Sequence, residues 1–431
     1  MSEGRARKFS ALDYRDPSPA PWLIHVLGLF NRLVLLPGVL KITRFDLPAD
    51  DERRLRAAVN RDAAAFLGPS HPEFLSDWLV DKELSRRVSP LMAHWAAYEI
   101  VNASPAARAF WLASNLIANV PGGGGKAYSV AWALEGHGVL LHPEGTATWQ
   151  GERIGPLLPG LVDMAREAAA QLRARGEQRP VWLVPVAWRF TFRGDVRRGL
   201  ARDMRKLERG MSLPSGERLG TPERFAALMR HLLSRQCERL GLAVPGERDD
   251  YFAAQARVIG SLVRALAERY GELDEDWTRA LFQLRRATRE RAATDPEGVR
   301  RDRTLVAELQ RLTGFDPVLY DRPELSQERI AEVLKRTRSS LLTRGFANAL
   351  HNTVPVAAGA RTAHVRVAEP IAVVADAQAG GTRAEHGSDA AARAALLAAH
   401  RARLQALLDQ LGDELAASGS IRRLPNLLHR G

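Results

Sequence analysis

The chain has 431 residues, of which 45% are hydrophobic and only one, Cys237, is a cysteine. This length exceeds what one compact core usually takes, so we expect two or more structural units. A lone cysteine excludes an internal disulfide, and we therefore expect a reducing environment. The net charge of +12 is compatible with anionic lipid headgroups, the phosphates of coenzyme A, or an acyl carrier protein. The basic segments lack interleaved aromatic residues and zinc-finger spacing, so nucleic acid is not expected as a partner.

Residues 1–48 are expected to form an amphipathic, membrane-associating segment. A helix is predicted over 21–36, with Trp22 and Phe30 as interfacial aromatic residues and Arg32 able to snorkel. Polar residues, glycines and a proline keep the apolar runs well short of the ~20 residues of a spanning helix. The helix therefore either anchors the protein at the cytoplasmic face of a membrane, as a peripheral or monotopic element, or packs on the domain.

A histidine follows the first predicted strand of the next segment. The apolar run 63–67 predicts a buried strand, and Pro72 suits the first position of a helix capped by Ser70 or His71. Six residues turn through about 600° on a helix, so His71 and Asp77 cannot meet as ordinary neighbours on one helix face. Their contact requires His71 to fold back from the loop.

The chemistry of such a contact is general base catalysis. A carboxylate at Asp77 would fix the tautomer of His71 and stabilise the imidazolium that forms when the ring takes a proton from an acceptor hydroxyl. The substrate would then supply the nucleophile. Glu73 is the alternative partner for the histidine.

Residues 119–126 contain four consecutive glycines and end in Lys126. The run does not match a phosphate-binding loop, because Ala127 stands where that loop needs Ser or Thr. We therefore expect a flexible turn near the substrate cleft.

A second candidate motif lies where a hydrophobic strand runs straight into Leu141-His-Pro-Glu-Gly-Thr146. Alone, such a sequence is typical of a turn before a helix. Its position downstream of the histidine–carboxylate pair favours an acyl-transfer enzyme instead. Residues 155–160, 184–187 and 365–371 are further segments that resemble parts of one known enzyme family.

In this order the motifs resemble the lysophospholipid acyltransferase superfamily, typified by 1-acylglycerol-3-phosphate acyltransferases. Its signatures are a His-x4-Asp box, similar to His71–Asp77 with one extra residue here, and a Phe-Pro-Glu-Gly-Thr-Arg box, similar to His142–Thr146. The resemblance spans about residues 42–189, and 365–371 is similar to the strand that closes the family's domain.

The resemblance implies an α/β fold, with a mixed sheet flanked by helices as in glycerol-3-phosphate acyltransferases, carrying a large helical insertion and a C-terminal helix. It implies an O-acyltransferase that moves a fatty acyl group from acyl-CoA or acyl carrier protein to a glycerolipid hydroxyl, such as that of 1-acylglycerol-3-phosphate or another lysophospholipid. The catalytic residues would be His71 and Asp77. No metal or prosthetic group is implied. The residues that would bind the acceptor are Pro143, Glu144, Gly145 and Thr146.

The departures from the family leave the acceptor open. Two arginines that the family associates with the acceptor's phosphate are missing; Lys126 is a candidate to replace the first, and Arg153 the second. Lysine lacks the bidentate fork of a guanidinium. The alternatives are an acceptor without phosphate, or a non-catalytic membrane or acyl-chain binding protein. His142 replaces the family's aromatic residue, and we expect a packing role for it.

The remaining chain is predicted to be mainly helical. Residues 49–195 would form the acyltransferase core and 196–352 a helical insertion of five or six helices. Residues 353–376 would supply closing strands, from 353–356 and 363–374. Residues 377–431 would then form a linker and a C-terminal helix over 390–417. The sequence indicates no oligomeric state.

Overall fold

The computed structural model describes residues 14–148, 150–246, 248–292, 294–342, 356–374 and 383–430. It divides into two compact units. The first, here the sheet unit, comprises Met1–Phe190 and Thr362–Glu414; the second, the helical unit, comprises Thr191–Arg361 and Leu415–Gly431.

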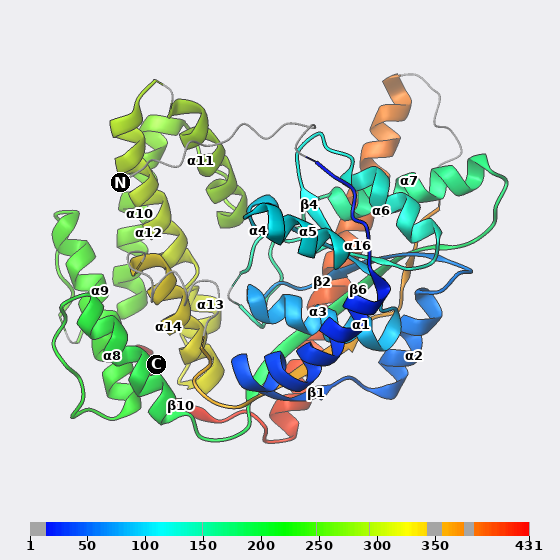
Figure 1. The fold of residues 1–431 in the computed structure, drawn as a ribbon. Helices are drawn as coiled ribbons and strands as arrows, with labels where there is room; N and C mark the ends of the chain where they lie inside the picture. Colours follow the sequence, from blue (N-terminus) through cyan, green and yellow to red (C-terminus); the bar gives the residue numbers. More distant parts are fainter. Residues whose placement is uncertain are drawn as a thin grey trace. The chain divides into compact units, whose positions relative to one another are not determined.

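The sheet unit is built on one mixed, mostly parallel sheet (Figure 1). Its strands follow the order β1-β8-β6-β2-β5-β3-β4, and β9 also pairs with β6. Strand β2 is parallel to both of its neighbours, β6 and β5, whereas β9 is antiparallel to β6. The expectation of an α/β fold with a mixed sheet flanked by helices is confirmed. The strands are β1 (Ile42–Asp46), β2 (Ala64–Pro69), β3 (Ala93–Ala97), β4 (Leu116–Asn119), β5 (Val139–Leu140), β6 (Val181–Phe192), β8 (Arg361–Val367) and β9 (Ile371–Ala372).

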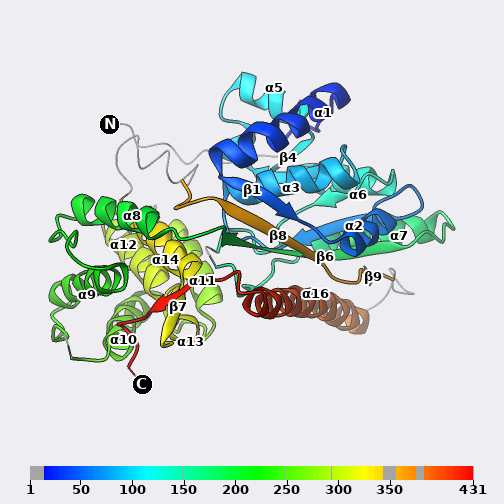
Figure 2. The ribbon, with the colours of Figure 1, turned by 90° about the horizontal axis from the view of Figure 1, so that it is seen from below.

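Helices cover both faces of this sheet, because side chains of a strand alternate between its faces. In β2, Ala65 and Leu67 belong to one core cluster, and Ala64 and Phe66 belong to the other. Figure 2 shows α2 and α3 on one side and α16 on the other. The helices of the unit beyond its N-terminal one are α2 (Ala49–Ala58), α3 (Leu75–Val88), α4 (Tyr98–Val101), α5 (Pro105–Ala113), α6 (Gly125–Leu134), α7 (Gly160–Ala174) and α16 (Arg383–Ala417).

The N-terminal helix packs by one face and leaves its other face uncovered. It consists of α1 (Pro21–Phe30) and a π-helical continuation, η2 (Asn31–Val39). The Asn31 amide donates to the Leu79 carbonyl of α3 at 2.8 Å. Arg32 Nη1 lies 3.6 Å from Glu83 Oε1. The whole stretch is long and apolar enough to cross a membrane by length and composition alone. The predicted helix over 21–36 is thus present and docks on α3.

The helical unit has a core of its own. Its helices are separated at Pro214, 241–245 and Gly271, Pro296 begins a helix, and the segment 314–323 contains the short helix Pro317–Tyr320. Leu200, Met204 and Leu207 are buried in this core. The elements are α8 (Arg197–Gly210), α9 (Thr221–Arg239), α10 (Tyr251–Tyr270), α11 (Trp277–Arg291), α12 (Pro296–Thr313), α13 (Pro317–Tyr320), β7 (Glu324–Ser326), α14 (Gln327–Leu341) and β10 (Arg423–Pro425).

The C-terminal part of the chain departs from expectation in two places. Helix α16 begins at Arg383, inside the expected linker, and residues 375–382 lie outside the described part of the chain. Beyond α16, β10 pairs with β7 of the helical unit, so the predicted segment 377–431 is divided between the two units. The strand expected at 363–374 is present as β8 and β9, whereas residues 353–355 are outside the described ranges.

Gly68 near the end of β2 marks a close approach between the sheet and α16. Its carbonyl accepts a hydrogen bond from His400 Nε2 at 2.9 Å. A Cβ atom at this position would lie 2.3 Å from that nitrogen and 2.5 Å from Leu161 Cδ2. Only glycine therefore lets α16 pack here.

We expect Gly68→Ala to lower the free energy of unfolding by about 1 to 3 kcal/mol, because the core would have to shift to admit the methyl group. Urea denaturation measures the change. Gly38→Ala is the matched control, since nothing lies within 4 Å of a Cβ atom there. Equal stability of the two variants would contradict the packing described for Gly68.

Candidate active site

The loop between β2 and α3 carries His71. Strand β2 ends at Pro69 and α3 begins at Leu75, so the predicted helix start at Pro72 is wrong. Asp77 lies in the first turn of α3, and its Oδ2 accepts the Glu73 N–H at 2.7 Å. This bond satisfies a backbone donor just before the helix and holds the preceding loop in a non-helical course.

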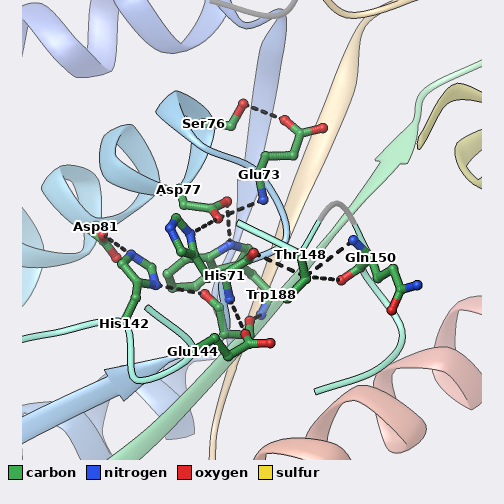
Figure 3. A network of polar contacts seen from close by, with 11 residues as sticks. His71, Glu73, Ser76, Asp77, Asp81, His142, Glu144, Thr148, Gln150 and Trp188 are labelled. Carbon is green, nitrogen blue, oxygen red and sulfur yellow. Dashed lines mark hydrogen bonds and ion pairs between the residues drawn. The ribbon is translucent and has the colours of Figure 1, made fainter. Parts of the chain in front are cut away.

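The His71 ring folds back from the loop onto Asp77, with Nδ1 2.8 Å from Asp77 Oδ2 (Figure 3). The carboxylate therefore selects the tautomer with its proton on Nδ1 and leaves the lone pair of Nε2 free. Among the described residues, Nε2 has no hydrogen-bond partner, and 12% of the side chain is exposed. Burial lowers the pKa of His71 well below 6.5, and the nearby His142 acts in the same direction. The ring is thus a neutral base at pH 7.

Asp77 is fully buried, and its two oxygens receive three N–H groups. Besides His71 and Glu73, the Trp188 indole N–H donates to Oδ1 at 3.0 Å. Burial and the charge of Glu73 raise the pKa of Asp77 well above its ordinary value, whereas the hydrogen bonds from Trp188 and from the Glu73 backbone lower it. Three donors on two acceptor oxygens form the environment of an ionised carboxylate.

Glu73, the alternative partner for the histidine, points elsewhere. Its carboxylate accepts from the Ser76 hydroxyl. Asp77 is therefore the partner of His71 in this structure.

Glu144 connects the two motifs of the sequence. Its Oε1 accepts the His71 N–H at 2.8 Å, and its Oε2 accepts the Gly155 N–H at 2.9 Å. Burial raises the pKa of Glu144, and these two backbone N–H groups lower it. The carboxylate thus positions the His71 loop from below, instead of presenting its oxygens to solvent.

The other residues of this motif shape the turn beside His71. Gly145 has φ +69°, and a Cβ there would lie 2.4 Å from Leu158 Cδ1. The Pro143 carbonyl accepts the Leu158 N–H at 2.6 Å. Thr146 is exposed. Gly145 and Thr146 therefore lie on the solvent side of the turn, where a substrate can reach them.

The two candidate substitutes for the missing arginines lie outside the network of Figure 3. Lys126 Nζ is 3.5 Å from Asp163 Oδ2, and the same carboxylate also receives Arg393. Arg153 is exposed and precedes Ile154, whose N–H donates to Gln405 of α16 at 2.9 Å. Both are surface cations of the sheet unit.

His142 packs against His71 and Trp188, but its two ring nitrogens also contact polar groups, which we did not expect. Its Nδ1 lies 3.0 Å from the Ser70 carbonyl and its Nε2 2.9 Å from Asp81 Oδ2. The ring stacks on His71, with centroids 4.2 Å apart and planes inclined by 21°.

Sequence reasoning missed three residues of the site. Thr148 donates its N–H to the His71 carbonyl at 2.8 Å, Asp81 contacts the His142 ring, and the Trp188 indole donates to Asp77. Asp81 had a signal in the sequence, because it lies four residues after Asp77 and hence on the same helix face. Trp188 directly follows the segment 184–187, but nothing in its sequence context indicates a carboxylate partner.

No group of three or more His, Cys, Asp or Glu side chains that could hold a metal ion occurs within the described residues. The site consists instead of a neutral histidine, its buried carboxylate and a turn exposed to solvent. Such a pair can remove a proton from a bound hydroxyl group. The chain matches none of the protein-family models and none of the curated proteins with which we compared it.

We expect Glu144→Gln to destabilise the protein by about 2 kcal/mol, because an amide NH2 would then face a backbone N–H that needs an acceptor. Activity should fall with it, since the His71 loop loses its support. Chemical denaturation and an activity assay measure the two effects. Thr146→Ala, in the same turn, should change the unfolding free energy by less than about 0.5 kcal/mol. Equal unfolding free energies of Glu144→Gln and Thr146→Ala would contradict the positioning role of Glu144.

Proposed function

We propose that this protein is an O-acyltransferase in which His71, oriented by Asp77, activates a hydroxyl group of the acceptor. The observation that carries the proposal is the free Nε2 of a neutral, buried histidine beside its carboxylate. Among the described residues, no serine, threonine or cysteine side chain hydrogen-bonds to that nitrogen. The pair therefore has the base and the orienting acid of a triad, and a substrate hydroxyl can take the third place.

The proposed reaction is direct transfer from a thioester. Nε2 of His71 takes the proton of the acceptor hydroxyl while the hydroxyl oxygen attacks the thioester carbonyl carbon. The carbon–sulfur bond then breaks, and the proton on His71 passes to the departing sulfur, which leaves as a thiol. Asp77 stabilises the imidazolium between these two steps.

The resemblance of the motifs supports a fold of the glycerol-3-phosphate acyltransferase type, a glycerolipid acceptor and an acyl-CoA or acyl carrier protein donor. A lysophospholipid such as 1-acylglycerol-3-phosphate is our first candidate acceptor, with Pro143–Thr146 at its binding turn. The pairing of Lys126 with Asp163 favours an acceptor without a terminal phosphate as the second candidate.

The uncovered face of the N-terminal helix supports action at the cytoplasmic face of a membrane. The side chains of Trp22 and Leu33 are 70% and 64% exposed, and Val26 and Leu29 lie on the same uncovered side. The opposite face is fixed to α3 by Asn31. A helix docked by one face and apolar on the other is typical of an interfacial anchor.

Acyl transfer from radiolabelled acyl-CoA and acyl carrier protein to a panel of lysolipids and glycerol 3-phosphate tests the activity. We expect product with the wild type and a loss of kcat/KM of at least about 100-fold in His71→Ala. His231→Ala, an exposed histidine of the helical unit, is the matched control and should behave as the wild type. A folded protein that binds lipid and yields no product with any acceptor would favour a non-catalytic binding protein.

The membrane proposal has its own test in vesicle flotation with phosphatidylethanolamine and phosphatidylglycerol. Val26→Glu/Leu33→Glu should reduce the bound fraction about tenfold or more, because two charges would enter the interface. Turnover of a soluble, short-chain acceptor should persist. Leu219→Glu places a charge at an exposed leucine of the helical unit and should bind as the wild type does. Unchanged binding of the double variant would contradict the anchor.

A further inference from the structure

A second histidine–carboxylate pair lies directly against the first. His142 follows β5, and its ring is parallel to that of His71 at the stacking distance given above. The Trp188 ring forms a T-shaped contact with His142, at a centroid distance of 5.7 Å and an angle of 88°. Figure 3 shows the two histidine rings side by side, with Asp77 next to His71 and Asp81 next to His142.

The two ring nitrogens of His142 both face acceptors. The Ser70 carbonyl can only accept a hydrogen bond, and an ionised Asp81 can also only accept. A neutral imidazole has a single N–H and cannot satisfy both contacts, which measure 3.0 and 2.9 Å. The pair must therefore hold one more proton than a neutral histidine beside a carboxylate.

That extra proton belongs on the ring. Burial lowers the pKa of His142, but the Asp81 charge and hydrogen bond, Glu144 and the Ser70 carbonyl together raise it above its ordinary value. Burial raises the pKa of Asp81 above its ordinary value, although the His142 charge and hydrogen bond lower it. Of the two groups, imidazole is the stronger base in water, so we assign an imidazolium beside a carboxylate.

Other ionisable groups lie around the two histidine–carboxylate pairs. Lys82 acts on Asp81, and burial brings the pKa of Lys82 down to about 7. Burial also holds the pKa of His94, on β3, well below 6.5. The groups around His142 itself are Asp81 from α3, His94 from β3, Glu144 from its own loop, and His71 with Asp77 from the β2–α3 corner.

We propose that Asp81 holds His142 as an imidazolium, and that this fixed positive ring keeps its stacked neighbour His71 in the neutral form that acyl transfer needs. The role of a neutral His71 in acyl transfer rests on the proposed function. The protonation states of the two rings do not depend on it. His142 is a positioning residue here, because both of its N–H groups are occupied and neither is free for a substrate.

The arrangement serves both proton transfers of the proposed reaction. Two stacked positive rings repel one another, so His71 resists protonation by solvent and remains a base below neutral pH. The imidazolium that forms during attack is then a stronger acid. It gives its proton more readily to the departing sulfur, since thiols have a pKa near 8.5 in water.

The protonation state can be measured without activity. In the full-length protein labelled with ¹⁵N-histidine, we expect both nitrogens of His142 to have imidazolium shifts at pH 7.5, whereas His71 has those of a neutral ring protonated at Nδ1. The variants His142→Phe and His71→Gln assign the signals. A His142 ring protonated only at Nδ1 would overturn the proposal, whatever the enzyme does.

The influence on His71 is measured in Asp81→Leu/His142→Phe, which keeps an aromatic ring in the stack and leaves no buried carboxylate unpaired. We expect the protonation midpoint of His71 to rise by about one pH unit, because the positive charge of His142 is removed. The rise is no larger because the negative charge of Asp81, which offset part of that effect, is removed with it. The acid limb of kcat/KM should move up by the same amount.

The matched control is His364→Phe, which removes a different histidine–carboxylate contact of the same unit, from His364 Nδ1 to Asp46 Oδ2 at 2.9 Å. It should leave both the His71 signal and the acid limb unchanged. A double variant that loses activity at every pH, with the His71 midpoint unmoved, would show a merely structural role. If the wild type is inactive but the His71 midpoint shifts in the double variant, the acyltransferase proposal is refuted and the inference about His142 stands.

Discussion

The buried carboxylate of Asp77 is the constraint on which the site depends. A buried charge costs several kcal/mol unless hydrogen bonds compensate it. Here the donors come from three places: the His71 ring, the Glu73 backbone and the Trp188 indole. One carboxylate therefore links the His71 loop, helix α3 and strand β6. If the His71 ring moved away, the buried charge of Asp77 would lose one of its three hydrogen bonds.

The order of the strands brings the two motifs of the sequence together. Strand β2 lies between β6 and β5, all parallel, so the segments that leave these strands meet at one edge of the sheet. His71 follows β2, His142 follows β5, and Trp188 lies on β6. Functional residues of parallel sheets characteristically gather at this carboxyl end. Glu144 then joins the loops after β2 and β5 by taking the N–H of His71.

Local signals in the sequence predicted a good part of this arrangement. The apolar run before His71 predicted β2, and the helical geometry showed that His71 has to fold back to reach Asp77. The start of α3 was misplaced because the Asp77 carboxylate reaches back to the Glu73 N–H, an effect that proline preferences do not reveal. The C-terminal strand β10 was missed because, within the described residues, it pairs with the short strand β7.

The remaining errors concern contacts between residues far apart in the chain. Trp188 and Asp77 are 111 residues apart, and His142 and Asp81 are 61 apart. The expectation that His142 packs as an aromatic residue was incomplete, because its carboxylate partner Asp81 lies on another element. Neither contact can be inferred before the strand order is known.

The central claim is direct transfer by a histidine–aspartate pair without a covalent acyl-enzyme. Intact-protein mass spectrometry during a single turnover, with enzyme in excess over acyl-CoA and the accepted lysolipid present, tests it most directly. The account predicts that acylated product accumulates while the protein retains its unmodified mass throughout. A transient species heavier by one acyl group, which forms and decays at the rate of turnover, would contradict it and assign the nucleophile to the protein.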